Sequence, residues 1–234
     1  HKNNCEILYP AIDPLKKFPK KSNKIIFTGK LNSSKGYDVF GKSIVKILDK
    51  HKNWEALAIG NEPREKFNFK HPNFKILDWV KHKKILKYYN NSAISVVPSK
   101  WQEPFGRTAM ESAAAGCATI TSTKGGLPET FDNKLFINQV NEIELFKIVN
   151  FLIKNKKIRH KHQQFNWRNV KHKLFDKVRK MDNLKNFYLN ANFNFNKGVK
   201  LKILHISTFD ERNDHRLFNI SIANKLSKGF IRNG

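Results

Sequence analysis

The sequence predicts an α/β protein with a doubly wound, parallel, Rossmann-like sheet. Short apolar runs alternate along the chain with longer amphipathic stretches, the pattern of strand and helix units that feed a parallel sheet. One run, residues 93–98, is almost continuously apolar, as expected of a strand that is buried on both faces. A turn bounded by glycines, residues 29–36, separates the first strand from the first helix.

Strands and helices are expected to follow one another through the core of this domain. Each predicted strand is a short run rich in β-branched or small apolar residues, and each predicted helix has apolar residues on one face. The predicted strands cover residues 25–28, 54–60, 74–77, 93–98 and 118–122. The predicted helices cover residues 37–50, 82–90 and 108–115.

The chain is expected to divide into four parts. Residues 1–20 form an extended hinge segment, and residues 21–182 form the α/β domain, closed by helices over residues 142–153 and 165–181. Residues 183–198 are predicted to be an asparagine-rich linker without a pattern that could pack. Residues 199–234 contain one strand and one helix, which cannot bury their apolar faces alone. They are interpreted as the truncated start of a second Rossmann-like domain.

The composition indicates a protein of the cytoplasm. Hydrophobic residues make up 39% of the chain, yet no apolar run approaches the roughly 20 residues that cross a bilayer. The two cysteines, Cys5 and Cys117, lie far apart, and Cys117 lies in a small apolar stretch where a thiol behaves as a core residue. We therefore expect a reducing compartment, no disulfide framework and no metal site.

The formal net charge of +26 raises the question of an anionic partner. Most of the basic residues are lysine, and asparagine and isoleucine are also abundant, a composition that AT-rich codon usage produces without any binding role. The sequence contains no ribonucleoprotein motif, zinc-finger spacing or basic-zipper heptad, so nucleic acid is not an expected partner. Peripheral contact with an anionic membrane surface stays open.

Three loops are expected to meet in one crevice. In doubly wound sheets, ligands bind outside the carboxyl ends of the strands. Residues 29–36, 99–107 and 123–129 each follow a predicted strand. These loops are therefore the place to look for functional residues.

Two glutamates bracket the start of a helix in the second loop. Glu103 precedes the helix and Glu111 lies in its first turns. Free backbone amides at Gly106, Arg107 and Thr108, together with the helix dipole, would form a seat for phosphate. The carboxylates would then flank the phosphate and accept hydrogen bonds from sugar or ribose hydroxyls. Taken singly, Glu111 also fits a simple dipole partner and Glu103 a surface charge.

The first loop contributes lysines. Lys30 and Lys35 lie on the turn that faces the predicted crevice, where a point charge suits a diphosphate. In a chain so rich in lysine, each of them also fits an ordinary solvated surface residue.

These motifs together resemble a known family. Gly29-Lys-Leu, Lys35-Gly36, the interval from Glu103 to Glu111, and Gly125-Gly-Leu-Pro-Glu129 are similar, in order and spacing, to the C-terminal domain of GT-B glycosyltransferases of family 4. The resemblance covers about residues 7–181. Residues 7–13 resemble the segment that joins the two family domains, and the helix after Phe165 resembles the closing helix that returns towards the N-terminal domain.

The resemblance implies a role for each matching residue. Lys35 would hold the donor diphosphate, and Lys30 stands where the family usually has arginine. Glu103 would bind hydroxyls of the donor sugar, and Glu111 the nucleotide ribose. The remaining donor-binding residues that it implies are Gly29, Val80, Phe105, Gly106, Arg107 and Thr108.

The expected function is therefore retaining transfer of a sugar from a nucleoside-diphosphate sugar to a saccharide or glycolipid acceptor. No metal or other cofactor is expected, and acceptor-side catalytic groups would belong to an N-terminal domain outside this chain. The histidines, His51, His71 and His82 among them, are expected to be surface residues. Two alternatives stay open: a nucleotide-sugar epimerase of the same fold, and a basic module that binds nucleic acid or membrane.

Overall fold

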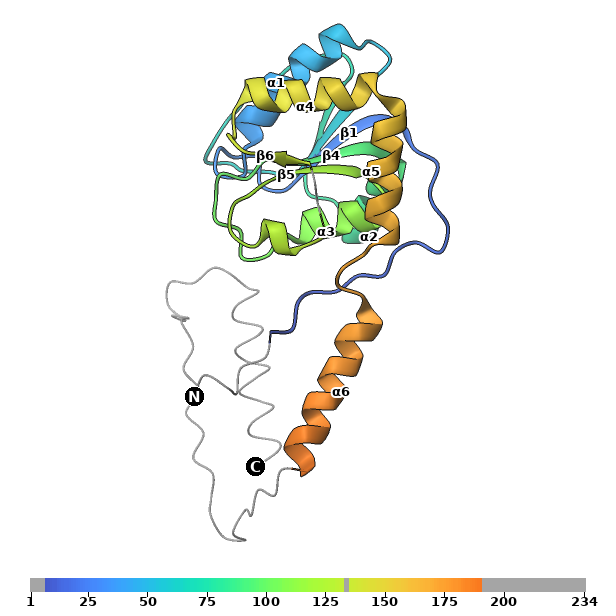
Figure 1. Ribbon diagram of the computed structural model, residues 1–234. Helices are drawn as coiled ribbons and strands as arrows, with labels where there is room; N and C mark the ends of the chain where they lie inside the picture. The colour runs from blue at the N-terminus through green and yellow to red at the C-terminus, as the bar shows by residue number, and fades with distance from the viewer. Residues whose placement is uncertain (1–6, 133–134, 191–234) are drawn as a thin grey trace. The chain divides into compact units, whose positions relative to one another are not determined.

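A computed structural model describes residues 7–132 and 135–190, with side chains to residue 184 (Figure 1). The chain forms a sheet of six strands in the order β3-β2-β1-β4-β5-β6. All neighbouring strands in this order pair in parallel. The strands are β1 (Ser22–Thr28), β2 (Glu55–Ile59), β3 (Phe74–Leu77), β4 (Ser92–Val97), β5 (Ala118–Ser122) and β6 (Phe136–Ile137). The order confirms the predicted doubly wound α/β fold.

Helices cover both faces of the sheet (Figure 1). On one face lie α1 (Tyr37–Lys50) and α4 (Glu142–Lys154), and on the other lie α2 (His82–Asn91) and α3 (Arg107–Ala114). A short 3-10 helix, η1 (Leu127–Glu129), follows β5, while α5 (Lys156–Arg168) and α6 (Leu174–Asn190) close the described chain. The compact domain ends at Leu184.

The core follows from the pattern of apolar residues. In α1, buried Phe40, Ile44, Ile47 and Leu48 recur at helical spacing and pack against the strands. All six residues of β4 are buried, because helices cover both faces of this central strand. The sheet is therefore a rigid support for the loops that leave its carboxyl ends.

The segment that precedes the domain lies along the connection between α5 and α6. The backbone N–H of Ile12 donates to the carbonyl of His172 at 2.9 Å, and the indole N–H of Trp167 donates to the carbonyl of Leu15 at 2.9 Å. The side chain of Asp13 accepts from the N–H of Leu174, which begins α6. These bonds join residues from the two ends of the domain.

The predicted helix over residues 165–181 is wrong in its boundaries. Two helices cover this region, α5 and α6, with a break over residues 169–173. The sequence pattern hid the first nine residues of α5 because its buried face carries Arg159, Gln163 and Asn166 instead of apolar residues. The side chains of Gln163 and Asn166 donate to the carbonyls of Ala93 and Cys117, each at 2.8 Å, so burial is compensated by hydrogen bonds.

Two further differences concern the end of the domain. Strand β6 was not predicted, because two residues carry no measurable alternation. Residues 183–190, assigned to the linker, continue α6 instead. Residues 191–198 of the predicted linker, and the predicted second domain at residues 199–234, lie outside the described residues.

Candidate functional site

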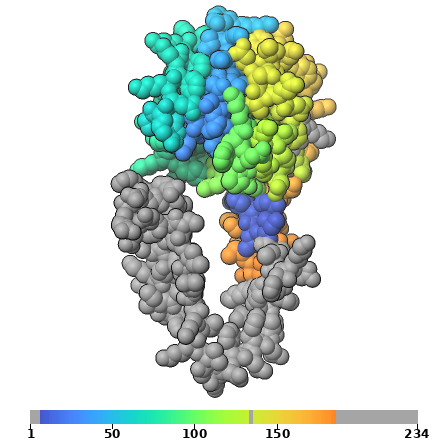
Figure 2. Space-filling model, turned by 90° about the vertical axis from the view of Figure 1, so that its left-hand side faces the viewer, coloured from blue at the N-terminus to red at the C-terminus, as the bar shows by residue number. Residues whose placement is uncertain are grey.

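A cavity of about 350 Å³ opens at the carboxyl ends of β1 and β4. Figure 2 looks onto this end of the domain, where atoms of the first loop, in blue, lie near green atoms from the region after β4. The cavity is lined by backbone and side chains of both loops and of the start of α3. Among the lining residues are Gly29, Lys35, Glu103, Phe105, Gly106, Arg107 and Thr108.

The first loop has a defined shape because Asn32 organises it. The buried Asn32 side chain accepts hydrogen bonds from the N–H of Lys35 at 3.0 Å and from the hydroxyl of Ser34 at 2.9 Å. The carbonyl of Ser34 in turn accepts from the backbone N–H groups that follow β4. Gly36 has a φ of 73°, and a Cβ there would collide with the carbonyl of Pro98. The loop is thereby fixed against its neighbour.

Two acidic residues that follow β2 bind side chains and backbone of the first loop. The carboxylate of Glu62 is buried and accepts from the guanidinium of Arg64 at 2.7 and 2.9 Å and from the amide of Asn32 at 3.2 Å. The hydrogen bonds from Arg64 lower the pKa of Glu62 to about 2. Glu65 accepts from both the N–H and the hydroxyl of Ser33. This support was not predicted from the sequence.

Lys35 and Glu103 meet inside the cavity. The ammonium of Lys35 lies 2.7 Å from a carboxylate oxygen of Glu103, and their side chains are 30% and 11% exposed. The N–H of Gly126 donates to the carbonyl of Glu103, so the third loop holds Glu103 in place. A lysine and a glutamate with one another as partners can each exchange that partner for a ligand group of opposite charge or for a hydroxyl.

The start of α3 forms one wall of the cavity. Gly106 precedes the helix with a φ of 97°, in the left-handed region, and a Cβ there would press into the side chain of Leu127. No side chain caps this helix end by a hydrogen bond. Arg107 and Thr108, whose backbone amides are the first of α3, line the cavity at the positive end of the helix dipole. This arrangement suits an anion.

Glu111 is buried one turn further along α3. Its side chain is 7% exposed, and one oxygen lies 3.0 Å from Nε2 of His82 and 3.4 Å from a guanidinium nitrogen of Arg107. Burial raises the pKa of the nearby Tyr89, and the charge of Glu111 adds to this rise. The hydroxyl of Tyr89 hydrogen-bonds to that of Thr28, a residue that lines the cavity. Tyr89 therefore bonds to the lining of the cavity and also feels the charge of Glu111.

His82 makes a contact that was not predicted from the sequence. It was expected to be a plain surface residue, and its side chain is indeed 54% exposed, but its ring also contacts Glu111. A signal was available: His82 follows the loop that contains Val80, one of the residues that the resemblance implied. Both residues lie at or just before the start of α2, outside the interval from Glu103 to Glu111 on which the prediction of the site was based.

The structure brings together most, but not all, of the predicted site residues. Gly29, Lys35, Glu103 and residues 105–108 line one cavity. Lys30 is exposed and does not line it. Val80 and Glu111 also lie outside its lining, beside α2 and in α3 respectively. The assigned roles of all these residues stay predictions.

Neither a metal cluster nor a spanning helix is found in the part of the chain that the structure describes. Within residues 7–132 and 135–190, no three histidine, cysteine or acidic residues are grouped so that they could hold a metal ion. Over the same residues, no helix is long and apolar enough to cross a membrane. Cys117 is a buried free thiol whose pKa is raised by burial.

The fold and the cavity together define a class of protein. The parallel sheet has a helix N-terminus, a lysine and a glutamate at its carboxyl edge, which is the arrangement of a Rossmann-like domain. Residues 10–166 match the family described as "Glycosyl transferases group 1". This match covers more than half of the 234 residues, and the chain belongs to that family.

Curated relatives agree with this family. The chain is 31% identical over 121 residues to spore coat protein SA of Bacillus subtilis, a match over 46% of this chain and 32% of that protein. It is 29% identical over 118 residues to an uncharacterized glycosyltransferase of Methanocaldococcus jannaschii, covering 47% and 30% of the two chains. It is 28% identical over 125 residues to an uncharacterized 42.6 kDa protein in the cps region of Klebsiella pneumoniae, covering 50% and 32%. The chain spans about a third of the length of these relatives.

Solved structures share the fold. The C-terminal domain of the group 1 glycosyl transferase LpcC from Francisella tularensis matches with a TM-score of 0.55 at 23% identity, over 72% of this chain and 94% of that one. The pneumococcal O-GlcNAc transferase GtfA, in complex with UDP and GlcNAc, matches with a TM-score of 0.61 at 16% identity, over 77% and 39%. The described domain is therefore of the GT-B type.

Proposed function

We propose that this chain carries the donor site of a retaining glycosyltransferase of family 4, which transfers a sugar from a nucleoside-diphosphate sugar to an acceptor hydroxyl. The observation that carries the proposal is the meeting of Lys35, Glu103 and the uncapped start of α3 in one cavity. These groups match the parts of such a donor: a diphosphate for the cations and the amides, and sugar hydroxyls for the carboxylate. The relative GtfA was solved with UDP and GlcNAc, which supports the donor class.

The same groups account for the chemistry. In transfer, the bond between the anomeric carbon and the diphosphate oxygen breaks, and a bond to the acceptor oxygen forms on the same face of the sugar. The proton of the acceptor hydroxyl would pass to the departing diphosphate. Negative charge develops on the departing diphosphate, where Lys35 and the amides of Arg107 and Thr108 would stabilise it. Lys35 would exchange Glu103 for the diphosphate, which frees the carboxylate of Glu103 for the sugar hydroxyls. Lys30, exposed beside the cavity, would add attraction at longer range.

The proposal assigns the nucleoside to the neighbouring region. Glu111 would accept from the ribose hydroxyls, and Val80 would meet the base through its backbone. Because Lys35 and the helix end supply the positive charge at the diphosphate, the proposal invokes no metal or other cofactor.

The acceptor side lies outside the residues that carry this site. We propose a saccharide or glycolipid acceptor bound by a further domain, since the curated relatives are about three times longer than the matched segment. The spore-coat and cps-region relatives favour surface polysaccharide assembly as the setting. A cytoplasmic enzyme with peripheral contact to an anionic membrane fits the charge of +26.

The test of the donor site is calorimetric titration of this chain with UDP and with GDP. Lys35→Ala should weaken binding of the preferred nucleotide at least tenfold, about 1.4 kcal/mol. Lys46→Ala is the matched control, because Lys46 also pairs with a glutamate, at 3.1 Å, but lies on α1 away from the cavity. Equal affinities of wild type and Lys35→Ala would refute the assignment.

A second measurement separates transferase from the alternative of an epimerase. Incubated with a nucleotide sugar alone, this chain should bind the donor and leave its sugar unchanged, because the acceptor groups belong elsewhere. Conversion of the bound sugar into an epimer without any acceptor would contradict a transferase.

A further inference from the structure

His82 and Arg107 approach the same oxygen of Glu111 from two different elements. His82 is the first residue of α2, and Arg107 is the first residue of α3, one helical turn before Glu111. Nε2 of His82 lies 3.0 Å, and a guanidinium nitrogen of Arg107 3.4 Å, from Oε1 of Glu111. Nε2 of His82 carries a proton both in the neutral Nε2–H tautomer and in the charged form of the ring.

Glu111 is buried, whereas the two side chains that contact it are exposed. His82 and Arg107 are 54% and 67% exposed, whereas Glu111 is 7% exposed. An ion pair between exposed side chains contributes little, but a buried carboxylate needs hydrogen bonds to offset the loss of water. Arg107 donates the hydrogen bond to this carboxylate, and His82 makes the closer polar contact, with Nε2 at 3.0 Å.

The position of these contacts sets the orientation of the carboxylate. Both are made to Oε1, which leaves Oε2 as the oxygen at which no bond is found among the described residues. A carboxylate held by one oxygen presents the other in a fixed direction, which lowers the entropy cost of binding a pair of hydroxyls. Because His82 belongs to α2, its contact with Glu111 also links the start of α2, which follows the loop that contains Val80, to α3.

We propose that His82 is a positioning residue that holds Glu111 for recognition of a vicinal diol, the 2′- and 3′-hydroxyls of a ribose. The inference rests on the proposed function, since it specifies how the nucleoside half of the donor site recognises its ligand. His82 acts through Glu111, so its contribution depends on the presence of the diol. It makes the site selective for ribonucleotides over nucleotides that lack both hydroxyls.

The experiment compares two probes, UDP and 2′,3′-dideoxy-UDP, by calorimetry with this chain. His82→Ala should weaken UDP about fivefold, because it removes one polar contact with a buried charged group, and should change the dideoxy affinity less than twofold. His82→Gln restores a side-chain N–H donor and should recover most of the UDP affinity. Lys84→Ala is the control, because Lys84 also lies exposed on α2 but extends over the ring of Tyr88. Melting temperatures of all variants establish that each is folded.

The outcomes separate the inference from the proposed function. If wild type binds UDP or GDP but His82→Ala leaves the UDP affinity unchanged, His82 has no positioning role and the proposed donor site stands. If His82→Ala weakens UDP and dideoxy-UDP equally, His82 acts on something other than the diol, and the inference is again overturned. If wild type binds neither nucleotide, the proposed function itself fails.

Discussion

A lysine lies at each end of the sheet, and the two differ in their partners: one pairs with a side chain and the other with backbone carbonyls. At the carboxyl end, Lys35 lies in a cavity and pairs with a side chain, Glu103. At the amino end, Lys21 is largely buried, and its ammonium donates to the carbonyls of Tyr89 at 2.9 Å and Ala115 at 2.6 Å. These carbonyls lie at the carboxyl-terminal ends of α2 and α3, where the helix dipole favours a cation. The carbonyl of Tyr89 also accepts from the N–H of Ser92 and the thiol of Cys117. Burial lowers the pKa of Lys21.

The difference shows which charges are available to a ligand. A lysine bonded to backbone carbonyls cannot leave them without exposing buried acceptors, so its contribution is to stability. A lysine bonded to a half-open side chain can exchange partners when an anion arrives. Mutations at the amino end should therefore change the free energy of unfolding, and mutations at the carboxyl end should change binding.

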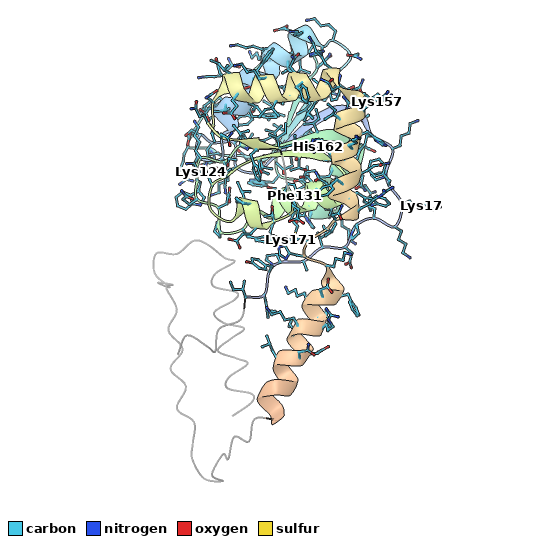
Figure 3. All side chains as sticks on the ribbon, viewed as in Figure 1. Lys17, Lys124, Phe131, Lys157, His162 and Lys171 are labelled. Atoms are coloured by element: carbon cyan, nitrogen blue, oxygen red, sulfur yellow. The ribbon has the colours of Figure 1, made fainter. Side chains whose placement is uncertain are left out.

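The largest effect on stability is expected at Lys21. Lys21→Met keeps the stem but leaves the carbonyl of Ala115 without its donor, so the free energy of unfolding in urea should fall by about 1–3 kcal/mol. Affinity for UDP should stay within twofold. Lys17→Met is the control, because Lys17 is exposed and lies on the side of the domain opposite Lys124 (Figure 3). A loss below about 0.5 kcal/mol would mean that solvent replaces the ammonium at these carbonyls.

The two glutamates of the site should differ in binding. Glu111→Gln removes the charge that accepts from a ribose, which is present in every nucleotide, so UDP affinity should fall about tenfold. Glu103→Gln releases Lys35 from its partner and should leave the affinity for UDP within twofold, since UDP lacks the sugar that Glu103 would bind. Calorimetry of both variants checks this. If Glu103→Gln weakens UDP as much as Glu111→Gln does, the division between sugar and ribose is wrong.

Regular elements of the fold could be predicted because their buried faces are apolar. The prediction for α1 has the observed bounds, Tyr37–Lys50, and those for β3 and β5 also agree with the structure. Helix α5 could not be predicted, because Arg159 and Gln163 occupy its buried face and satisfy backbone carbonyls there. Periodicity detects burial of apolar groups, and it misses burial that hydrogen bonds compensate.

In the candidate site, too, the sequence predicted some features and missed others. The glycine loop and the interval from Glu103 to Glu111 predicted which loops would meet, since the carboxyl ends of parallel strands share one edge. The pair of Lys35 and Glu103, however, joins residues 68 positions apart and depends on loop shapes. The contact of His82 with Glu111 depends likewise on how α2 docks beside α3. Spacing along a helix predicts neighbours only within that helix.

A smaller and pH-dependent effect is expected at Glu62, behind the first loop. Its pKa of about 2 lies below the value of about 4.3 for an unfolded glutamate. Folding is therefore favoured by the ionised form, and this contribution is complete above about pH 4.3 and is lost as the pH falls towards 2. Glu62→Gln should lower the melting temperature at pH 7, and the difference from wild type should shrink between pH 5 and pH 3.

The control for Glu62 is Glu55→Gln. The side chain of Glu55 is 55% exposed and pairs with Lys24 at 3.0 Å, a surface pair that should contribute little at any pH. A difference between wild type and Glu62→Gln that stays constant from pH 7 to pH 3 would show that the charge of Glu62 is not what stabilises the loop.

The smallest effect is expected at Tyr37, the first residue of α1, and its sign is opposite. Tyr37 is buried among aromatic rings, and its hydroxyl has no hydrogen-bond partner among the described residues. Burial raises the pKa of Tyr37 to about 12. Removing an unpaired buried hydroxyl lifts a desolvation cost, so Tyr37→Phe should raise the free energy of unfolding by about 0.5–1 kcal/mol.

Tyr89→Phe is the matched comparison for Tyr37→Phe, because Tyr89 is equally buried but its hydroxyl bonds to that of Thr28. The same atomic deletion there leaves Thr28 without a partner at the edge of the cavity, so stability should fall by about 1 kcal/mol. Urea unfolding of both variants under one set of conditions gives the two signs directly. Equal losses at both positions would mean that Tyr37 is hydrogen-bonded in solution, for example to a buried water, and that the two tyrosines do not differ in this respect.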